Sequence, residues 1–365
     1  KKKKKITVAP PPMNVPPPQM IVVRPLLPSL AEVDNPAERQ AFWKDFCDSI
    51  SAQHDRTPGC QPLSLSRKML GRVLEHDYAV TLKSDGVRFV LFMTTRSSSP
   101  PGAPQPVALM IDRSGTMFEV EVVAVADAFE KKTVLEGELV WRQPHEESML
   151  FLVFDCLRSS GRLMLRDPFR VRRAELERLT RYSEDVDQSD DVEQQVDESQ
   201  SIVLSQYTPR VRMRSKTFVE RRFASTLWDQ RSEVDHRVDG IVLQDQNAVY
   251  RFGTAYDGSI LKWKMFATID LQGGVTPDRL PRTADGPLPA LVHGRRFTVR
   301  ADSRIKPETE ETIVEYLVTT DECLVTLFAM RVRQDKERAN SLRVVEATVN
   351  DVLEAITPAE IGAGP

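Results

Sequence analysis

The stretch Lys83-Ser84-Asp85-Gly86-Val87-Arg88 follows directly on an apolar, strand-like segment, Tyr78–Leu82. Asp and Gly favour a turn, and a lysine that leads from a strand end into a turn can present its amine to a binding site. An ammonium group has no lone pair, so this lysine must lose its proton before it can act as a nucleophile. Burial and a neighbouring cation favour that loss, and Arg88 can supply the cation. Taken alone, so short a motif is also compatible with a surface hairpin turn.

The segments around this stretch are short, rich in β-branched and aromatic residues, and separated by turn residues, which predicts strands. The predicted strands are Tyr78–Leu82, Arg88–Thr94, Val107–Asp112, Met117–Val122, Val134–Trp141, Met149–Leu157, Gly240–Gln244, Val249–Phe252 and Ile260–Met265. Helices are predicted at Ala37–Ser51, where Asn35-Pro36 supplies a cap and a first-turn proline, and at Val171–Tyr182.

The rest of the chain differs in composition. Residues 1–28 are dense in proline and are expected to form an extended tail. Residues 183–200 are dominated by Asp, Glu, Gln and Ser, and are expected to form a disordered insertion. After residue 270, the strand-like segments Arg296–Ala301, Thr312–Thr319 and Leu324–Val332 predict a small β-barrel, and Val349–Ile356 predicts a short amphipathic helix.

Composition excludes several classes of protein. The 365 residues carry 50 basic and 53 acidic side chains and are 41% hydrophobic, which is typical of a soluble globular protein with two domains. The four cysteines are widely spaced and the five histidines are scattered, so neither a zinc site nor a histidine-based triad is indicated. No apolar run approaches the ~20 residues that span a bilayer, so no membrane partner is expected. The run Lys1–Lys5 is typical of a solvated tail, with a nuclear signal as the alternative.

The order of five short elements resembles that of the covalent nucleotidyltransferase superfamily, which comprises mRNA-capping guanylyltransferases and ATP- or NAD-dependent polynucleotide ligases. The elements are Lys83-Ser84-Asp85-Gly86, Leu135-Glu136-Gly137-Glu138, Phe154-Asp155, Val238-Asp239-Gly240-Ile241-Val242 and Leu261-Lys262-Trp263-Lys264. Each element is weakly informative alone, but the shared order makes a chance match improbable.

The residue types also fit a common chemistry. Glu138 and Asp239 are two carboxylates that can hold a divalent cation against phosphate oxygens. Phe154 is either a core aromatic or a stacking surface for a base. Lys262 and Lys264 are two apart on one strand and therefore project to the same face, where an anion such as a triphosphate would balance their charge.

Four further stretches are similar to the mRNA-capping branch of the superfamily. They are Pro58-Gly59-Cys60-Gln61-Pro62-Leu63-Ser64-Leu65, Thr268-Ile269-Asp270, Ile313-Val314-Glu315 and the RxRxDKxxxN-like run from Met330 to Asn340. The resemblance covers roughly Pro58 to Ile356. Two positions depart from the family pattern. Glu136 stands where the family often has Asp, which is expected to have no consequence, and Met265 stands where it often has proline.

The resemblance implies an α+β fold: a nucleotidyltransferase domain of antiparallel sheets flanked by helices (residues 29–270), followed by a C-terminal OB-fold β-barrel (271–345) and a C-terminal helix and tail (346–365). It implies that Lys83 is the nucleophile that accepts GMP, and that Glu138 and Asp239 hold Mg²⁺ or Mn²⁺. The remaining implied roles are contacts with the nucleotide, made by Arg88, Arg113 (at the ribose), Phe154 and Ile241 (at the two faces of guanine), Lys216 (at guanine O6), Lys262 and Lys264 (at the α-phosphate), and Arg333, Asp335 and Lys336 (at the β- and γ-phosphates).

The implied activity is an mRNA 5′-cap guanylyltransferase that forms lysyl-N–GMP from GTP, releases pyrophosphate and transfers GMP to a diphosphate-ended RNA. An ATP-dependent DNA or RNA ligase that uses the same lysine is the alternative. The implied partners are GTP, 5′-diphosphate RNA, and an RNA triphosphatase, a cap methyltransferase and the transcription machinery. The expected location is the nucleus, or a cytoplasmic viral factory or virion for a viral source.

Overall fold

The structure, a computed structural model, describes residues 31–52, 59–96, 104–120, 122–123, 126–142, 149–185, 203–204, 211–273, 280–300, 305, 309, 311–334 and 336–364. The chain divides into a larger unit (Arg24–Met265 with Glu354–Pro365) and a smaller unit that contains Phe266–Leu353. Strand β18 (Thr268–Gln272), which the predicted domain boundary at residue 270 divides, falls entirely in the smaller unit. The predicted tail 1–28 and residues 186–200 of the predicted insertion lie outside the described residues.

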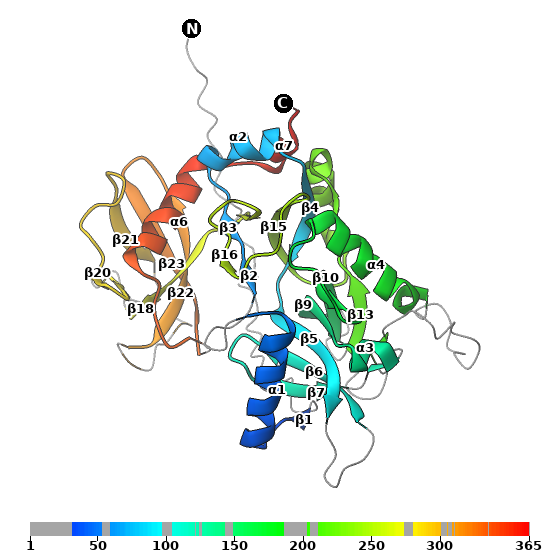
Figure 1. Cartoon of the computed structure of the whole chain (residues 1–365). Helices are drawn as coiled ribbons and strands as arrows, with labels where there is room; N and C mark the ends of the chain where they lie inside the picture. Colours follow the sequence, from blue (N-terminus) through cyan, green and yellow to red (C-terminus); the bar gives the residue numbers. More distant parts are fainter. Residues whose placement is uncertain are drawn as a thin grey trace. The chain divides into compact units, whose positions relative to one another are not determined.

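The first sheet of the larger unit is antiparallel throughout except at β13, which pairs parallel to β10 (Figure 1). Its strand order is β1 (Ala31–Glu32), β7 (Met117–Val120), β6 (Gln105–Asp112), β5 (Val87–Arg96), β9 (Thr133–Trp141), β10 (Met149–Ser159) and β11 (Arg162–Leu163), with β13 (Val211–Ser215) beside β10.

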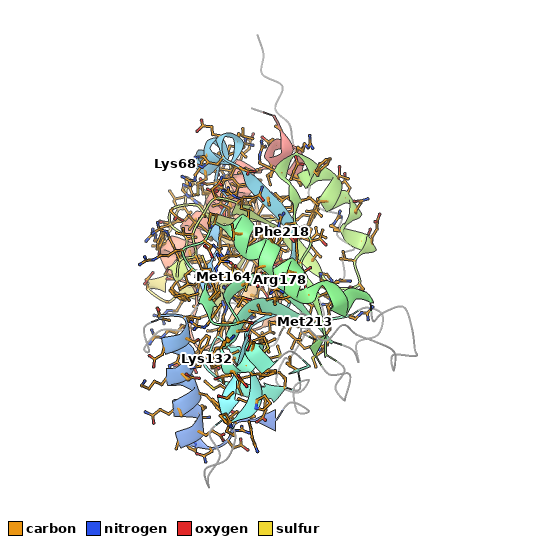
Figure 2. The ribbon with its side chains drawn as sticks, turned by 45° about the vertical axis from the view of Figure 1, so that its right-hand side comes forward. Lys68, Lys132, Met164, Arg178, Met213 and Phe218 are labelled. Carbon is orange, nitrogen blue, oxygen red and sulfur yellow. The ribbon has the colours of Figure 1, made fainter. Side chains whose placement is uncertain are left out.

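Helices cover this sheet. Helix α1 (Pro36–Ser49) begins where Asn35 accepts hydrogen bonds from the backbone amides of Ala37 and Glu38, as the sequence predicts. Its buried Phe46 packs against Phe92 of β5, with ring centroids 5.4 Å apart. Helix α4 (Phe169–Asp185) packs on β10 and β13, and Figure 2 labels Arg178 on the helix and Met213 on β13. The short helix α3 (Ala126–Glu130) contacts β5 and β6.

The second sheet has the order β14 (Val219–Glu220), β4 (Tyr78–Ser84), β15 (Val238–Asp245), β17 (Ile260–Lys264) and β3 (Leu63–Ser64). Its buried face joins a core with residues of α2 (Arg67–Glu75), α5 (Ala224–Asp229) and α7 (Pro358–Gly362). The remaining elements of the unit are the pairs β8 (Val122–Val123) with β12 (Val203–Leu204) and β2 (Cys60–Gln61) with β16 (Gly253–Thr254), and the 3-10 helices η3 (Arg221–Phe223) and η4 (Gln230–Glu233).

The smaller unit is built on one six-stranded sheet, which stands where the resemblance implied an OB-fold barrel. Its strand order is β20 (Gly286–Pro287), β19 (Arg282–Thr283), β18, β22 (Ile313–Thr320), β23 (Leu324–Val332) and β21 (Arg296–Arg300). Helix α6 (Leu342–Glu354) packs Val345 and Val349 into the apolar core of this sheet. The α+β fold with antiparallel sheets flanked by helices is thereby confirmed.

Two elements differ from the prediction. Val249–Phe252 is not a strand but an irregular surface segment, in which Val249 and Phe252 are exposed. Tyr250 alone is buried, and its backbone amide donates to the carbonyl of Leu165 instead of to a neighbouring strand. Helix α6 begins at Leu342 rather than Val349. The carboxylate of Asp285 accepts a hydrogen bond from the amide of Leu342, a cap that comes from a distant loop. Among the described residues, no helix is both long and apolar enough to cross a membrane.

Candidate functional site

Lys83 and Lys264 lie on one face of the second sheet, with Gly240 between them. Gly240 of β15 pairs with Lys83 of β4 on one side and with Lys264 of β17 on the other. Residues that stand directly opposite each other on antiparallel strands share a face of the sheet. A Cβ on Gly240 would lie 2.0 Å from the carbonyl oxygen of Trp263, so only glycine fits here. The strand register therefore brings two lysines from distant elements to one row.

Asp239 is the extra residue of a β-bulge. Strand β15 pairs Val238 with Ser84 and Gly240 with Lys83, which leaves Asp239 without an opposite residue on β4. A bulge re-aims its side chain. Here the carboxylate of Asp239 accepts from the Nζ of Lys83 at 2.8 Å and lies 2.8 Å from the Nζ of Lys264. Burial raises the pKa of Asp239, but the two lysines outweigh burial and the pKa is lowered, so Asp239 is ionised.

The charge state of Lys83 differs from the sequence-based expectation. Burial lowers its pKa, as expected, but Asp239, Glu138 and Asp85 outweigh burial, and the net pKa is raised. Arg88 does not provide the activating charge, because its guanidinium is paired with Glu136. The expected depression of the lysine pKa is therefore wrong for this structure. A cation that balances the negative charge of these carboxylates would lower the pKa of Lys83 and so favour the neutral amine.

A second set of side chains comes from the first sheet. Phe154 is the extra residue of a bulge in β10, since Val153 pairs with Gly137 and Asp155 pairs with Glu136. Its ring is half-buried. The ring centroid lies 5.6 Å from the guanidinium carbon of Arg88 and 6.0 Å from the Nζ of Lys216. Phe154 thus has a partly open face beside a buried cation.

Lys216 is the most buried cation of the site. Its side chain is 8% exposed, and its Nζ lies 3.6 Å from a carboxylate oxygen of Glu138. Burial lowers the pKa of Lys216, and Lys83 lowers it further, against the opposing effects of Glu138 and Asp239. The same two carboxylates act on Lys83. Lys83, Lys216, Glu138 and Asp239 therefore form one electrostatic cluster that joins the two sheets.

Arg88 lies in a buried polar network that the sequence did not reveal. Its guanidinium donates to the carboxylate of Glu136 and to the carbonyl of Cys60. The hydroxyl of Tyr250 donates to the other oxygen of Glu136 at 3.0 Å and accepts from the amide of Cys60, also at 3.0 Å. Glu136, which stands where the family often has Asp, is the centre of this network. The replacement of Asp by Glu at this position was expected to have no consequence. Arg88 thereby anchors the Gly59–Cys60 stretch, while its guanidinium also lies near the ring of Phe154.

A buried ion pair adjoins this network. Arg172 of α4 forms two hydrogen bonds to the carboxylate of Asp155, at 2.7 and 3.0 Å, and its guanidinium lies 5.6 Å from the ring of Tyr250. Both side chains of the pair are almost fully buried. Arg172 was not singled out from the sequence, because an arginine within a charged helix is ordinarily exposed.

The remaining predicted residues of the larger unit are Arg113, which follows a strand of the first sheet, and Lys262 and Ile241 of the second sheet. Arg113 directly follows β6. Burial and the charge of Arg88 lower the pKa of Arg113, while Glu138 and Glu136 raise it, so Arg113 lies within electrostatic reach of these three residues. Lys262 pairs with Val242, on the same face as Lys83. Ile241 is fully buried in the core on the opposite face, so its predicted contact with guanine is wrong. Val242 of β15, opposite Lys262, lies on the lysine face instead.

In the smaller unit, three stretches that resemble the capping family meet. Asp270 pairs with Glu315 across β18 and β22. Arg333 lies 3.1 Å from a carboxylate oxygen of Asp270 and 3.7 Å from one of Glu315, and Lys336 bonds to the other oxygen of Asp270. The amide of Asp270 donates to the side chain of Asn340. The predicted basic residues are therefore held by two carboxylates. Asp335 lies outside the described residues.

Glu138 and Asp239 suit a divalent cation. Carboxylate oxygens are the ligands that Mg²⁺ and Mn²⁺ prefer, and Mg²⁺ is usually held by one or two carboxylates together with water and substrate phosphates. The described residues contain no group of three or more His, Cys, Asp or Glu side chains that could hold a metal. Two carboxylates near Lys83, Lys216 and Lys264 would fit a cation whose remaining ligands are water and an anionic substrate.

Comparison with known proteins gives the family. Residues 28–266, more than half of the chain, match the family described as "mRNA capping enzyme, catalytic domain". Curated relatives include the mRNA-capping enzyme subunit alpha of Schizosaccharomyces pombe, 24% identical over 342 residues that cover 86% of this chain and 80% of the relative. Another is the mRNA-capping enzyme subunit alpha of Yarrowia lipolytica, 28% identical over 214 residues that cover 57% of this chain and 50% of the relative.

The chain thus spans about half the length of the Yarrowia relative. Similar solved structures include a mycobacterial DNA ligase D complexed with ATP and MES, at 14% identity and a TM-score of 0.41, covering 76% of this chain and 95% of that chain. The matched region of the capping family contains Lys83, Glu138, Phe154, Lys216, Asp239 and Lys264. The chain therefore belongs to the mRNA capping enzyme family and is a nucleotidyltransferase.

Proposed function

We propose that this enzyme is an mRNA 5′-cap guanylyltransferase. Lys83 attacks the α-phosphorus of GTP, a lysyl-N–GMP bond forms, and pyrophosphate leaves. The GMP then passes from Lys83 to the terminal phosphate of a diphosphate-ended RNA, which restores the free lysine. The observation that carries the proposal is the cluster of Lys83, Lys216, Glu138 and Asp239 in a member of the capping family.

Each residue of the cluster has a role in the first step. Lys264 lies in the same row as Lys83, where its charge stabilises an α-phosphate in the transition state. Asp239 holds both ammonium groups in place before the nucleotide binds. Glu138 and Asp239 would hold a Mg²⁺ or Mn²⁺ ion, which would supply positive charge to phosphate oxygens. With their charge so balanced, both carboxylates would stabilise the Lys83 proton less.

The pair of Phe154 and Lys216 supports guanine as the base. The half-buried ring of Phe154 can stack on a purine, and the Nζ of Lys216 lies 6.0 Å from that ring. A charged lysine only donates hydrogen bonds. The carbonyl O6 of guanine accepts such a bond, whereas the 6-amino group of adenine does not. This chemistry favours GTP over the ATP that a ligase would use.

The smaller unit is proposed to serve the leaving pyrophosphate. Arg333 and Lys336 are held by Asp270 and Glu315. Such pairing keeps flexible basic side chains in a defined arrangement until a more highly charged group competes for them. The proposed partners are an RNA triphosphatase, which would produce the diphosphate end, and a methyltransferase, which would modify the finished cap.

Labelling with α-³²P nucleotides tests the proposal. With Mg²⁺ or Mn²⁺, GTP should label the chain covalently, so that the label stays on the protein in denaturing electrophoresis. On addition of diphosphate-ended RNA, the label should move to the RNA. Lys83→Arg should give no label, since an arginine side chain stays protonated and cannot be the nucleophile. Labelling by ATP in place of GTP would refute the proposal and identify a ligase.

A further inference from the structure

Three side chains beside the nucleophile form a hydrogen-bonded chain. The Oγ of Ser84 lies 3.0 Å from the Nε2 of His236, and the Nδ1 of His236 lies 3.3 Å from a carboxylate oxygen of Asp235. An ionised carboxylate only accepts hydrogen bonds, so Nδ1 carries a proton. Burial lowers the pKa of His236 and favours the neutral ring, in which Nε2 accepts from the hydroxyl of Ser84. Burial raises the pKa of Asp235, but bonds from His236 and Arg142 outweigh burial and keep it ionised.

The hydrogen-bonded order Ser84, His236, Asp235 is also that of a hydrolytic triad, but the burial of the serine excludes that role. Ser84 is 0% exposed, so no substrate atom reaches its hydroxyl. The side chain of its neighbour Lys83 is 20% exposed and contacts Asp239. The chain of hydrogen bonds therefore ends on the residue next to the nucleophile.

Asp235 connects this chain to the first sheet. The Nε of Arg142, directly after β9, lies 2.7 Å from one oxygen of Asp235, and a nitrogen of Arg214 in β13 lies 3.5 Å from the other. Strand β9 carries Glu138, and Lys216 follows β13. Ser84, at the other end of the chain, is the last residue of β4 in the second sheet. The bonds therefore run from one sheet to the other.

The backbone is held at the same place. The amide of Asp85 donates to the carbonyl of Arg237 at 2.8 Å, and Ser84 pairs with Val238. The segment from Asp235 to Val238 thus holds both the side chain and the backbone next to Lys83. Successive side chains of a strand point to opposite faces. Holding Ser84 on one face therefore fixes the direction of Lys83 on the other.

We propose that His236 is a positioning residue for Lys83, which acts through Ser84 to hold the lysine amine in place against Glu138 and Lys216 of the first sheet. The inference rests on the proposed function, in which Lys83 is the nucleophile. Attack requires the reacting atoms to be aligned, and a misplacement of about 1 Å costs on the order of 100-fold in rate. The loss of this chain should therefore appear in the chemical step.

The test compares three variants. Ser84→Ala removes the donor, His236→Phe keeps a ring without hydrogen bonds, and His236→Gln keeps an oxygen that can accept from Ser84. At saturating nucleotide, Ser84→Ala and His236→Phe should lower the single-turnover rate of adduct formation by about 10- to 100-fold, with KM changed by less than about threefold. His236→Gln should recover part of the rate. The Ser84→Ala/His236→Phe double variant should lose no more than the worse single variant.

Ser159→Ala is the matched control. It removes another buried serine hydroxyl, which donates to Glu175 at 2.5 Å and lies in the first sheet away from Lys83, and it should leave the rate unchanged. A raised KM with an unchanged rate, or losses that multiply in the double variant, would overturn the inference. So would a loss in Ser84→Ala that is explained entirely by a smaller folded fraction.

Nitrogen NMR of the His236 ring requires no nucleotide. It should show Nε2 as an acceptor in the wild-type enzyme and a changed Nε2 signal in Ser84→Ala; identical signals would refute the hydrogen-bonded chain.

If ATP rather than GTP labels the wild-type enzyme, the proposed function fails, whereas the kinetic test proceeds with ATP. Labelling by neither nucleotide would refute both.

Discussion

Lys216→Met removes a cation that we propose to contact the base, while keeping the length of the side chain. The Lys216 side chain is 8% exposed and lies 6.0 Å from the ring of Phe154. A hydrogen bond from a charged donor in such a buried place contributes about 1.5–3 kcal/mol. The kcat/KM for adduct formation with GTP should therefore fall by about 10- to 100-fold. ATP makes no such bond, so its kcat/KM should change much less, and the preference for GTP should collapse.

Lys264→Met provides the control for this prediction. It removes the same charge from the same length of side chain, but in the row of Lys83, where the α-phosphate is common to both nucleotides. Lys264→Met should therefore lower the labelling rates with GTP and with ATP alike, and leave the ratio of the two rates unchanged. Single-turnover labelling with each nucleotide over a range of concentrations measures both ratios. A GTP-to-ATP preference that survives in Lys216→Met would show that base recognition lies elsewhere.

Three further predictions follow from the contacts of other residues. Tyr250→Phe removes a hydroxyl that bonds both Glu136 and Cys60, and should lower the free energy of unfolding by about 1–3 kcal/mol, measured by urea denaturation; an unchanged midpoint would contradict the buried network. Lys336→Ala should slow adduct formation by about 100-fold but leave GMP transfer from isolated adduct to RNA nearly unchanged; equal damage to both single-turnover rates would assign Lys336 a role in RNA transfer. Burial raises the pKa of Glu315, but Arg331 and Arg333 outweigh burial and hold this pKa below its ordinary value. The ionised Glu315 therefore stabilises the fold at neutral pH, and this stabilisation is lost as the pH falls through the folded pKa. Glu315→Gln should lower Tm at pH 7 and have a much smaller effect in acid, below that pKa, measured by thermal denaturation at both pH values.

The sequence located most of the strands and the residues that could meet, because local composition and the order of short elements are read along the chain. It correctly predicted that Lys262 and Lys264 share a face, since that follows from the geometry of a strand. It could not show that Lys264 and Lys83 share a row, which depends on how β4, β15 and β17 pair. Register between distant strands is a tertiary property.

The errors have specific physical causes. Ile241 was assigned to the base, but the bulge at Asp239 shifts the alternation of β15, so Ile241 lies in the core. The cap of α6 comes from Asp285, far away in the sequence. The scattered histidines gave no indication that folding brings His236 against Ser84. In each case the missing information is a contact between segments that are distant along the chain.

The bulge at Asp239 also has a consequence for protein engineering. On a regular strand, Asp239 would alternate with Ile241 and Leu243, which are both buried in the core on the far side of the sheet. The carboxylate reaches the lysines only because β15 has one residue more than its partner at this point. Transplanting the site onto another scaffold would therefore require the extra residue as well as the right side chains. With every catalytic residue copied but the spacing made regular, the graft would bury a charge among apolar side chains and leave the two lysines without their carboxylate.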